Sequence, residues 1–158
     1  MCRLAAKYRG SLNGGIMLST SKILKMTHQF NRFYSQELGR VADTHKMSRV
    51  ELDVLLFLHN NPDYDTARDI VEYRLLAKSY VSKAVDLLIR RRFLAAVEDS
   101  RDRRILHLTI CGAASGILKE ALSAQQTIFK TAVKGIPEKE LSVMEKVMSQ
   151  MSENISSF

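Results

Sequence analysis

The hydrophobic period of this 158-residue chain changes near its middle, and this change limits the possible folds more than any other feature. Before residue 93, apolar residues recur at helical spacing. Phe93 to Val97 and Ile105 to Thr109 instead have the pattern of two short strands, and they flank a charged hexapeptide, Asp99 to Arg104. The pattern predicts a small β-hairpin with a charged tip in a fold that is otherwise mainly α-helical.

Helices are expected on both sides of the hairpin. A long first helix spans Ile16 to about Leu38. Ser48 and Glu51 form a capping box that starts a second helix, which stops at Asn61 and Pro62. After the hairpin, we expect Thr109 to cap a fifth helix, Gly135 to follow its end in a left-handed conformation and Pro137 to begin a sixth.

The third and fourth helices are separated by a very short connection. Asp65 or Thr66 caps a helix that ends near Tyr73, residues 74–77 form a tight turn, and Lys78 or Ser79 opens the next helix. That fourth helix has an apolar stripe and a polar, basic face, and the stripe consists of Val81, Ala84, Val85 and Leu88. Such a pair is either an ordinary helical corner or a helix-turn-helix whose second helix enters the major groove. The hairpin favours the second interpretation, because arginines at its tip can reach the minor groove.

The charge distribution indicates a polyanionic partner. The chain carries a formal charge of +7, and between Lys78 and Arg104 there are eight basic and four acidic residues. This charge spans a helix and the segment after it, whereas a membrane-binding segment would combine charge with one broad apolar face. No apolar run is long enough to cross a bilayer. We therefore expect double-stranded DNA, and not a membrane, to be the partner.

Other functions lack their usual motifs. There is no glycine-rich phosphate loop and no nucleophile with a base at a recognised spacing, so we expect neither an enzyme nor a bound cofactor. No metal-ligand spacing connects the histidines at 28, 45, 59 and 107. Cys2 and Cys111 suggest no disulfide framework, and this fits a reducing, cytoplasmic location. Residues 1–15 have no secretory apolar stretch and are expected to form a flexible basic tail.

The stretch from Thr66 to Gly112 resembles the MarR (multiple antibiotic resistance regulator) family. Three segments carry the resemblance: the helix pair ARDIVEYRLLAKSYVSKAVDLLIRR, the hairpin tip DSRDRR, which fits D-x-R-D-x-R, and LTICG, which fits L-T-x-x-G. The resemblance extends over residues 16–155 and implies a winged helix-turn-helix transcriptional regulator. It implies one unit over 16–158, with a DNA-binding lobe at 48–111 and dimerisation helices at 16–38 and 112–156.

Dimerisation has independent support in the sixth helix. Apolar residues there are spaced by three and four residues alternately, as in a coiled-coil seam: Leu141, Met144, Met148, Met151 and Ile155. The resemblance implies that the first, fifth and sixth helices interlock with those of a second copy. We therefore expect a homodimer that binds a palindromic operator.

Chemistry and resemblance together assign the DNA contacts. The exposed face of the fourth helix offers hydroxyl and ammonium groups to bases and phosphates from Lys78, Ser79, Tyr80, Ser82 and Lys83. Arg101 and Arg103 are expected at the wing tip. Asp99 is expected to fix an arginine by a charge-assisted bond, and with Arg104 it supports the wing.

Two arginines depart from the family pattern. Arg92 stands where the family usually has glycine, and Arg74 where it commonly has an apolar residue. Each would either contact phosphate or point into solvent.

The resemblance also implies regulation by a ligand. Most relatives are repressors that release DNA when a small, often aromatic, molecule enters the crevice between the dimerisation helices and the DNA-binding lobe. Candidate lining residues are Phe30, Tyr34, Phe57 and His59, which fit a core equally well.

Three alternatives stay open. One is a helical adaptor that binds only proteins, and another is a metal-sensing regulator. The third is a redox sensor based on Cys111, which is expected just inside the fifth helix, where thiolate chemistry is favoured.

Overall fold

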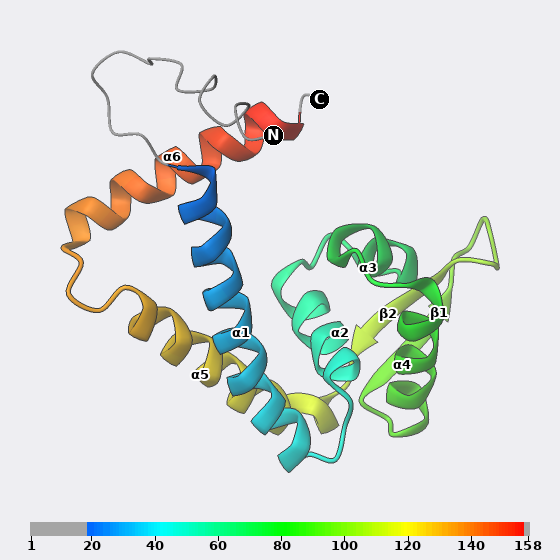
Figure 1. The fold of residues 1–158 in the computed structure, drawn as a ribbon. Coiled ribbons are helices and arrows are strands. Elements are labelled where there is room, and N and C mark those ends of the chain that lie inside the picture. Colours follow the sequence, from blue (N-terminus) through cyan, green and yellow to red (C-terminus); the bar gives the residue numbers. More distant parts are fainter. Residues whose placement is uncertain (1–18, 157–158) are drawn as a thin grey trace, which may run out of the picture. The chain divides into compact units, whose positions relative to one another are not determined.

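The computed structural model describes residues 19–156. Their helices and strands follow one another as shown in Figure 1: α1 Thr20–Thr44, α2 Arg49–Asn60, α3 Ala67–Arg74, α4 Lys78–Arg90, β1 Leu94–Glu98, β2 Leu106–Ile110, the 3-10 helix η1 Gly112–Ala114, α5 Ser115–Ala132 and α6 Glu138–Ser156. The expected fold, mainly α with one small hairpin, is confirmed. The chain divides into two compact units, Met1–Arg32 and Phe33–Phe158, and α1 begins in the first and ends in the second.

Helix α2 is at the centre of the core of residues 33–158. Every side chain from Glu51 to Leu58 is buried, and the helix contacts α3, α4, α5 and β2. Leu52 and Leu55 are completely inaccessible, as are Ile70 of α3 and Val81 of α4. Burial of several large aliphatic side chains, each stabilising by about 1.5–3 kcal/mol, fixes how α3 and α4 pack on α2.

Local hydrogen bonds explain where α2 and α3 begin. The predicted capping box of α2 is present, because Glu51 donates its N–H to Ser48 Oγ at 3.2 Å and Ser48 donates its N–H to Glu51 Oε2 at 2.7 Å. A second capping box joins Thr66 and Asp69. Thr66, one of the two expected candidates, is therefore the cap of α3.

The first helix is longer than expected. We predicted an end near Leu38, but α1 continues to Thr44 because Val41 and Ala42 extend its buried stripe by one more turn. Lys46, with a φ of 49°, then reverses the chain before α2.

The hairpin is present, one residue later than predicted. β1 and β2 are antiparallel, with Leu94 opposite Ile110 and Glu98 opposite Leu106. Phe93 is excluded from the strand because its N–H still bonds the carbonyl of Leu88, which closes the end of α4.

The expected cap of the fifth helix was wrong. Thr109 lies in β2 opposite Ala95, so its backbone belongs to the sheet. The chain instead turns through η1, and α5 begins at Ser115. Cys111 precedes η1 and is therefore not inside the fifth helix, as we had expected.

Helix α6 differs from the others in having no buried side chain. Gly135 has a φ of 82° in the turn before it, as predicted, and the carbonyl of Pro137 accepts the first hydrogen bonds of the helix. Six apolar side chains of α6 are 39% to 69% exposed, namely Val143, Met144, Val147, Met148, Met151 and Ile155. None of the described helices is both long enough and apolar enough to span a membrane.

Candidate nucleic-acid interface

Helix α4 presents the expected polar face to solvent. Its apolar stripe packs into the core, with Val81 and Leu88 fully inaccessible, and this orients the opposite face outward. The five predicted contact residues are all exposed: Lys78, Ser79, Tyr80, Ser82 and Lys83. The turn that precedes α4 is held by Leu75, a left-handed residue with a φ of 50°.

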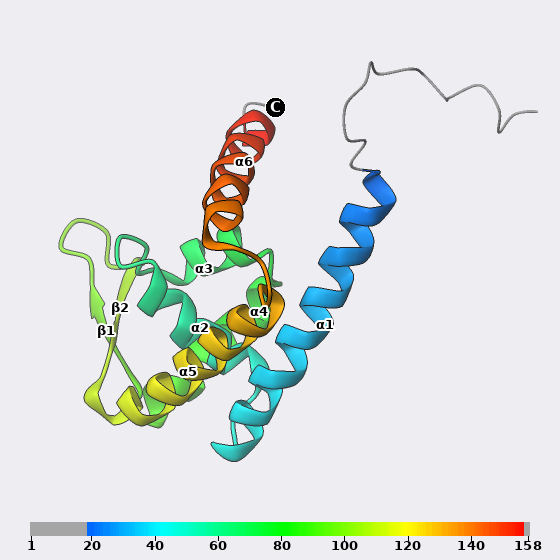
Figure 2. The ribbon, with the colours of Figure 1, turned by 90° about the vertical axis from the view of Figure 1, so that its left-hand side faces the viewer.

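The hairpin tip is a folded turn organised by two carboxylates. Asp99 Oδ1 accepts the N–H groups of Arg101 and Asp102, each at 2.8 Å, and Asp102 Oδ1 accepts the N–H of Arg104 at 3.0 Å. These backbone N–H groups, that of Asp102 first, lower the pKa of Asp99 below its usual range, with a smaller contribution from His107. The carboxylates therefore fix the shape of the tip, which extends away from the helices in both views (Figure 1 and Figure 2).

Asp99 supports the wing in a different way from the one we expected. Within residues 19–156, its carboxylate bonds backbone N–H groups and a histidine but no arginine side chain. The side chains of Arg101 and Arg103 are exposed at the tip, and neither makes an ion pair within the described part of the chain. Both guanidinium groups are therefore available to a partner.

Arg104 lies close to α4, the second helix of the helix-turn-helix. It lines a hollow of about 470 Å³ together with Lys78 and Ser82 of α4 and with residues of α3. Neither Lys78 nor Arg104 forms an ion pair among the described residues, whereas Arg68 on the same hollow bonds Glu72 at 2.8 Å. This hollow therefore places Arg104 of the wing close to Lys78 and Ser82 at the start of α4.

Arg74 and Arg91 instead form hydrogen bonds with other residues of the same chain. Arg74 Nη2 donates to Asp53 Oδ1 at 2.8 Å, and Arg49 bonds the same oxygen at 3.1 Å. Arg74 therefore does not point freely into solvent, because its guanidinium is paired with Asp53. Arg91 donates to the carbonyls of His45 and Lys46 and lies 3.5 Å from Glu51.

The family preference for glycine at position 92 has a conformational reason. Arg92 has a φ of 59°, a left-handed conformation that a residue with a Cβ adopts at a cost of about 1 kcal/mol. Its side chain is exposed.

His107 is a residue whose role the sequence pattern did not reveal. Its Nδ1 lies 2.8 Å from Asp65 Oδ1, and its Nε2 lies 3.4 Å from Asp99 Oδ2. The bond to Asp65, and then that to Asp99, raises the pKa of His107 above its ordinary value, and desolvation opposes them. The two carboxylates lie on opposite sides of the ring, and no group of three or more potential metal ligands converges among residues 19–156.

The predicted effector residues are only partly brought together. Tyr34 and Phe57 line a pocket of about 200 Å³ with Tyr73, Arg74 and Gln125, and Gln125 donates to the Tyr34 hydroxyl at 2.6 Å. His59 is exposed and does not line this pocket. Phe30 belongs to the unit Met1–Arg32 and is partly exposed.

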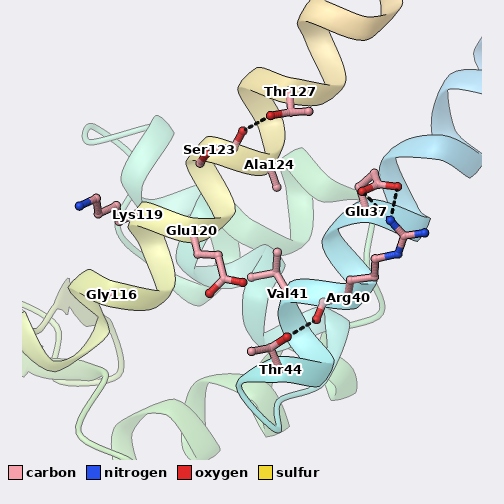
Figure 3. Close-up of a pocket in the computed structure, with 10 residues that line it drawn as sticks. All are labelled: Glu37, Arg40, Val41, Thr44, Gly116, Lys119, Glu120, Ser123, Ala124 and Thr127. Carbon is pink, nitrogen blue, oxygen red and sulfur yellow. Dashed lines mark hydrogen bonds and ion pairs between the residues drawn. The ribbon is translucent and has the colours of Figure 1, made fainter.

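A larger hollow of about 550 Å³ lies between α1 and α5 (Figure 3). Glu37 and Arg40 on its wall pair with each other at 2.9 Å, and Glu120 bonds His45 at 2.7 Å. No aromatic ring lines this hollow. It is therefore less suited to an aromatic ligand than the pocket at Tyr34.

The structure has a helix-turn-helix whose second helix, α4, presents an exposed basic face, and a hairpin with arginines at its tip adjoins it. This combination is that of a winged-helix DNA-binding protein. Residues 45–105 match the family model described as MarR family. This part of the chain, which includes the helix-turn-helix and the hairpin as far as Ile105, is therefore similar to MarR-family proteins.

Several solved structures share the fold of this chain. A MarR transcriptional regulator from Methanosarcina mazei Go1 superposes with a TM-score of 0.71 at 13% identity, over 87% of this chain and 98% of that chain. Bordetella bronchiseptica BpsR, which 6-hydroxynicotinic acid regulates, gives 0.63 at 17% identity over 83% and 98%. A mutant of S. aureus MepR bound to an oligodeoxyribonucleotide gives 0.52 at 17% identity over 87% and 98%. A search of curated proteins finds no significant match.

Proposed function

We propose that this regulator is a repressor that binds a palindromic operator as a homodimer. In the proposed complex, α4 enters the major groove and the wing places Arg101 or Arg103 in the adjacent minor groove. The observation that carries the proposal is the hollow shared by Lys78, Ser82 and Arg104, because it makes the helix and the wing parts of one surface. Phosphate contacts by Lys78 and Arg104 would set the register of α4 on the duplex.

The proposed dimer uses the helices outside the DNA-binding lobe. The lobe comprises residues 48–111, and the helices at 16–38 and 112–156 supply the dimer contacts. The exposed apolar seam of α6 supports this arrangement, because monomeric proteins rarely leave such a stripe uncovered. A two-fold dimer predicts two half-sites about one helical turn apart. A regulator of this kind would act in the cytoplasm, where bacterial DNA is accessible.

The wing has a direct test. Duplexes are first selected from a random pool, and affinity for the selected site is then measured over a salt series. We expect Arg101→Ala and Arg103→Ala together to weaken binding roughly tenfold or more and to reduce the salt slope by about one to two units, because guanidinium contacts to phosphate or the minor groove are lost.

The matched control for the wing test is Lys134→Ala. Lys134 is an exposed basic residue beyond α5, outside the DNA-binding lobe, so its removal should change affinity much less. If the wing double variant binds the selected site as tightly as the parent at every salt concentration, the wing does not contact DNA. If the parent protein binds all duplexes equally weakly, the result would favour the alternative of a helical adaptor that binds only other proteins.

The pocket at Tyr34 is the proposed effector site. Arg49 and Arg74 share one carboxylate, Asp53, so the three side chains together carry a surplus positive charge beside the rings of Phe57 and Tyr73. Aromatic rings and a cation together suit a single-ring aromatic acid. The regulation of BpsR by 6-hydroxynicotinic acid supports this class of ligand.

The effector is tested by titrating 6-hydroxynicotinic acid and related single-ring aromatic acids into the protein–operator complex. We expect an acid of this class to release the DNA and Arg74→Leu to raise the concentration required roughly tenfold, the loss expected for one charge-assisted contact. The neutral amides of the same compounds are the control. If no acid affects operator binding, or if the Arg74 variant responds as the parent does, the pocket is not the effector site.

A further inference from the structure

His107 joins the wing to the start of the helix-turn-helix. It lies in β2, whereas Asp65 lies in the segment just before α3, 42 residues earlier in the chain. The backbone makes the same connection, because Leu108 donates its N–H to the Asp65 carbonyl at 2.7 Å and His107 forms a β-bridge with Thr66. The base of the wing is therefore joined to the segment just before α3 by both side-chain and backbone contacts.

The imidazole can hold both carboxylates only when it carries two protons. A neutral imidazole has one N–H, and an ionised carboxylate only accepts hydrogen bonds. If neutral His107 donates to Asp65 at 2.8 Å, the lone pair of its Nε2 faces Asp99 Oδ2 at 3.4 Å, and the contact becomes repulsive. Protonation replaces this repulsion with a second attractive contact.

Within the described part of the chain, the groups that shift the pKa of His107 are carboxylates and include no cation. Within residues 19–156, Asp65 and Asp99 are the charged groups that bond its ring. Val97 lies opposite it on β1, and the neighbouring Glu98 pairs in register with Leu106. On α3, the carboxylate of Asp69 bonds the N–H and hydroxyl of Thr66. The charge of His107 is therefore decided by the two carboxylates on its flanks.

We propose that the doubly protonated form of His107 is a positioning element, which holds the wing in the orientation that binds DNA and makes operator affinity depend on pH. This inference rests on the proposed role of the wing in DNA binding. Above the pKa of His107, Asp99 loses its contact with the ring, and the wing tip loses the side-chain connection that runs through His107 to Asp65.

The direction of the effect follows from the raised pKa of His107. The stabilisation of the docked wing is fully present below the ordinary histidine pKa of about 6.5 and is lost as the pH rises through the higher pKa of the folded protein. Operator affinity should therefore be higher at acidic pH and should fall towards alkaline pH.

The test is a series of operator affinities at constant ionic strength from about pH 5.5 to about pH 8.5, the range over which histidines titrate. We expect the parent to lose roughly threefold to tenfold in affinity across this range, as for one partly exposed charge-assisted contact. His107→Gln, which is always neutral, should bind at every pH about as weakly as the parent does at high pH. His59→Gln, which removes an exposed histidine from α2, should keep the parent profile.

A second measurement does not depend on the stability of the His107 variant. The ring proton of His107 followed by NMR should titrate at a higher pH in the parent than in Asp65→Asn, because the asparagine removes the first carboxylate. A His107→Gln profile parallel to that of the parent would overturn the proposal, as would an unchanged His107 titration in Asp65→Asn. If Arg101→Ala and Arg103→Ala weaken binding while His107→Gln has no effect, only this inference fails and the role of the wing stands.

Discussion

Val85→Asp is expected to leave little folded protein at room temperature. Val85 is 6% exposed and belongs to the stripe by which α4 packs into the core. An unpaired carboxylate at this position would cost about 3–5 kcal/mol or more, which is comparable to the total stability of a marginally stable small domain, about 5–15 kcal/mol. Urea unfolding followed by circular dichroism measures the loss directly.

Ser82→Asp is the matched control, because it adds the same carboxylate to the exposed face of the same helix. Its free energy of unfolding should stay within about 0.5 kcal/mol of the parent, as for most surface substitutions. Its operator affinity should nevertheless fall by roughly tenfold or more, because a carboxylate at the groove repels phosphate. An unfolded Ser82→Asp or a stable Val85→Asp would mean that α4 presents a different face to DNA.

Met148→Asp is expected to convert the proposed dimer into monomers at micromolar concentration. Met148 is at the middle of the seam on α6 and is 60% exposed in the single chain. In a two-fold dimer one substitution introduces two carboxylates into an apolar contact, and a loss of roughly a hundredfold or more in association is expected from their desolvation and repulsion. Analytical ultracentrifugation measures the change.

Ser149→Asp adds the same charge to α6 one residue further along, outside the predicted seam. It should leave the association constant close to that of the parent. The proposed dimer binds both half-sites of the operator at once. The Met148 variant should therefore also lose affinity for the full operator, while keeping weak binding to a single half-site. Unchanged sedimentation of Met148→Asp would show that the α6 seam is not the dimer contact.

The features that were predicted correctly depend on residues close in the sequence. The Ser48 capping box requires residues three apart, and the exposed face of α4 follows from the spacing of four apolar side chains. The left-handed Gly135 is likewise a property of one residue in its turn. Patterns of this kind can be recognised before any packing is known.

The features that were missed depend on contacts between distant segments. Arg74 is 21 residues from its partner Asp53, and His107 is 42 residues from Asp65. No periodicity connects such pairs, so the sequence pattern could not show that Arg74 pairs with Asp53 or that a histidine joins the hairpin to the segment before α3. Thr109 was misassigned because threonine suits both a β-strand and a helix cap. Its strand pairing with Ala95 decided between the two.

The shared carboxylate of Asp53 has a consequence for substitutions at position 74. The side chain of Asp53 is only 12% exposed, whereas that of Arg74 is 34% exposed. Replacement of Arg74 alone would leave this largely buried carboxylate with Arg49 as its remaining ion-pair partner among the described residues. The fold is therefore expected to tolerate joint replacement of Arg74 and Asp53 by apolar residues better than replacement of Arg74 alone.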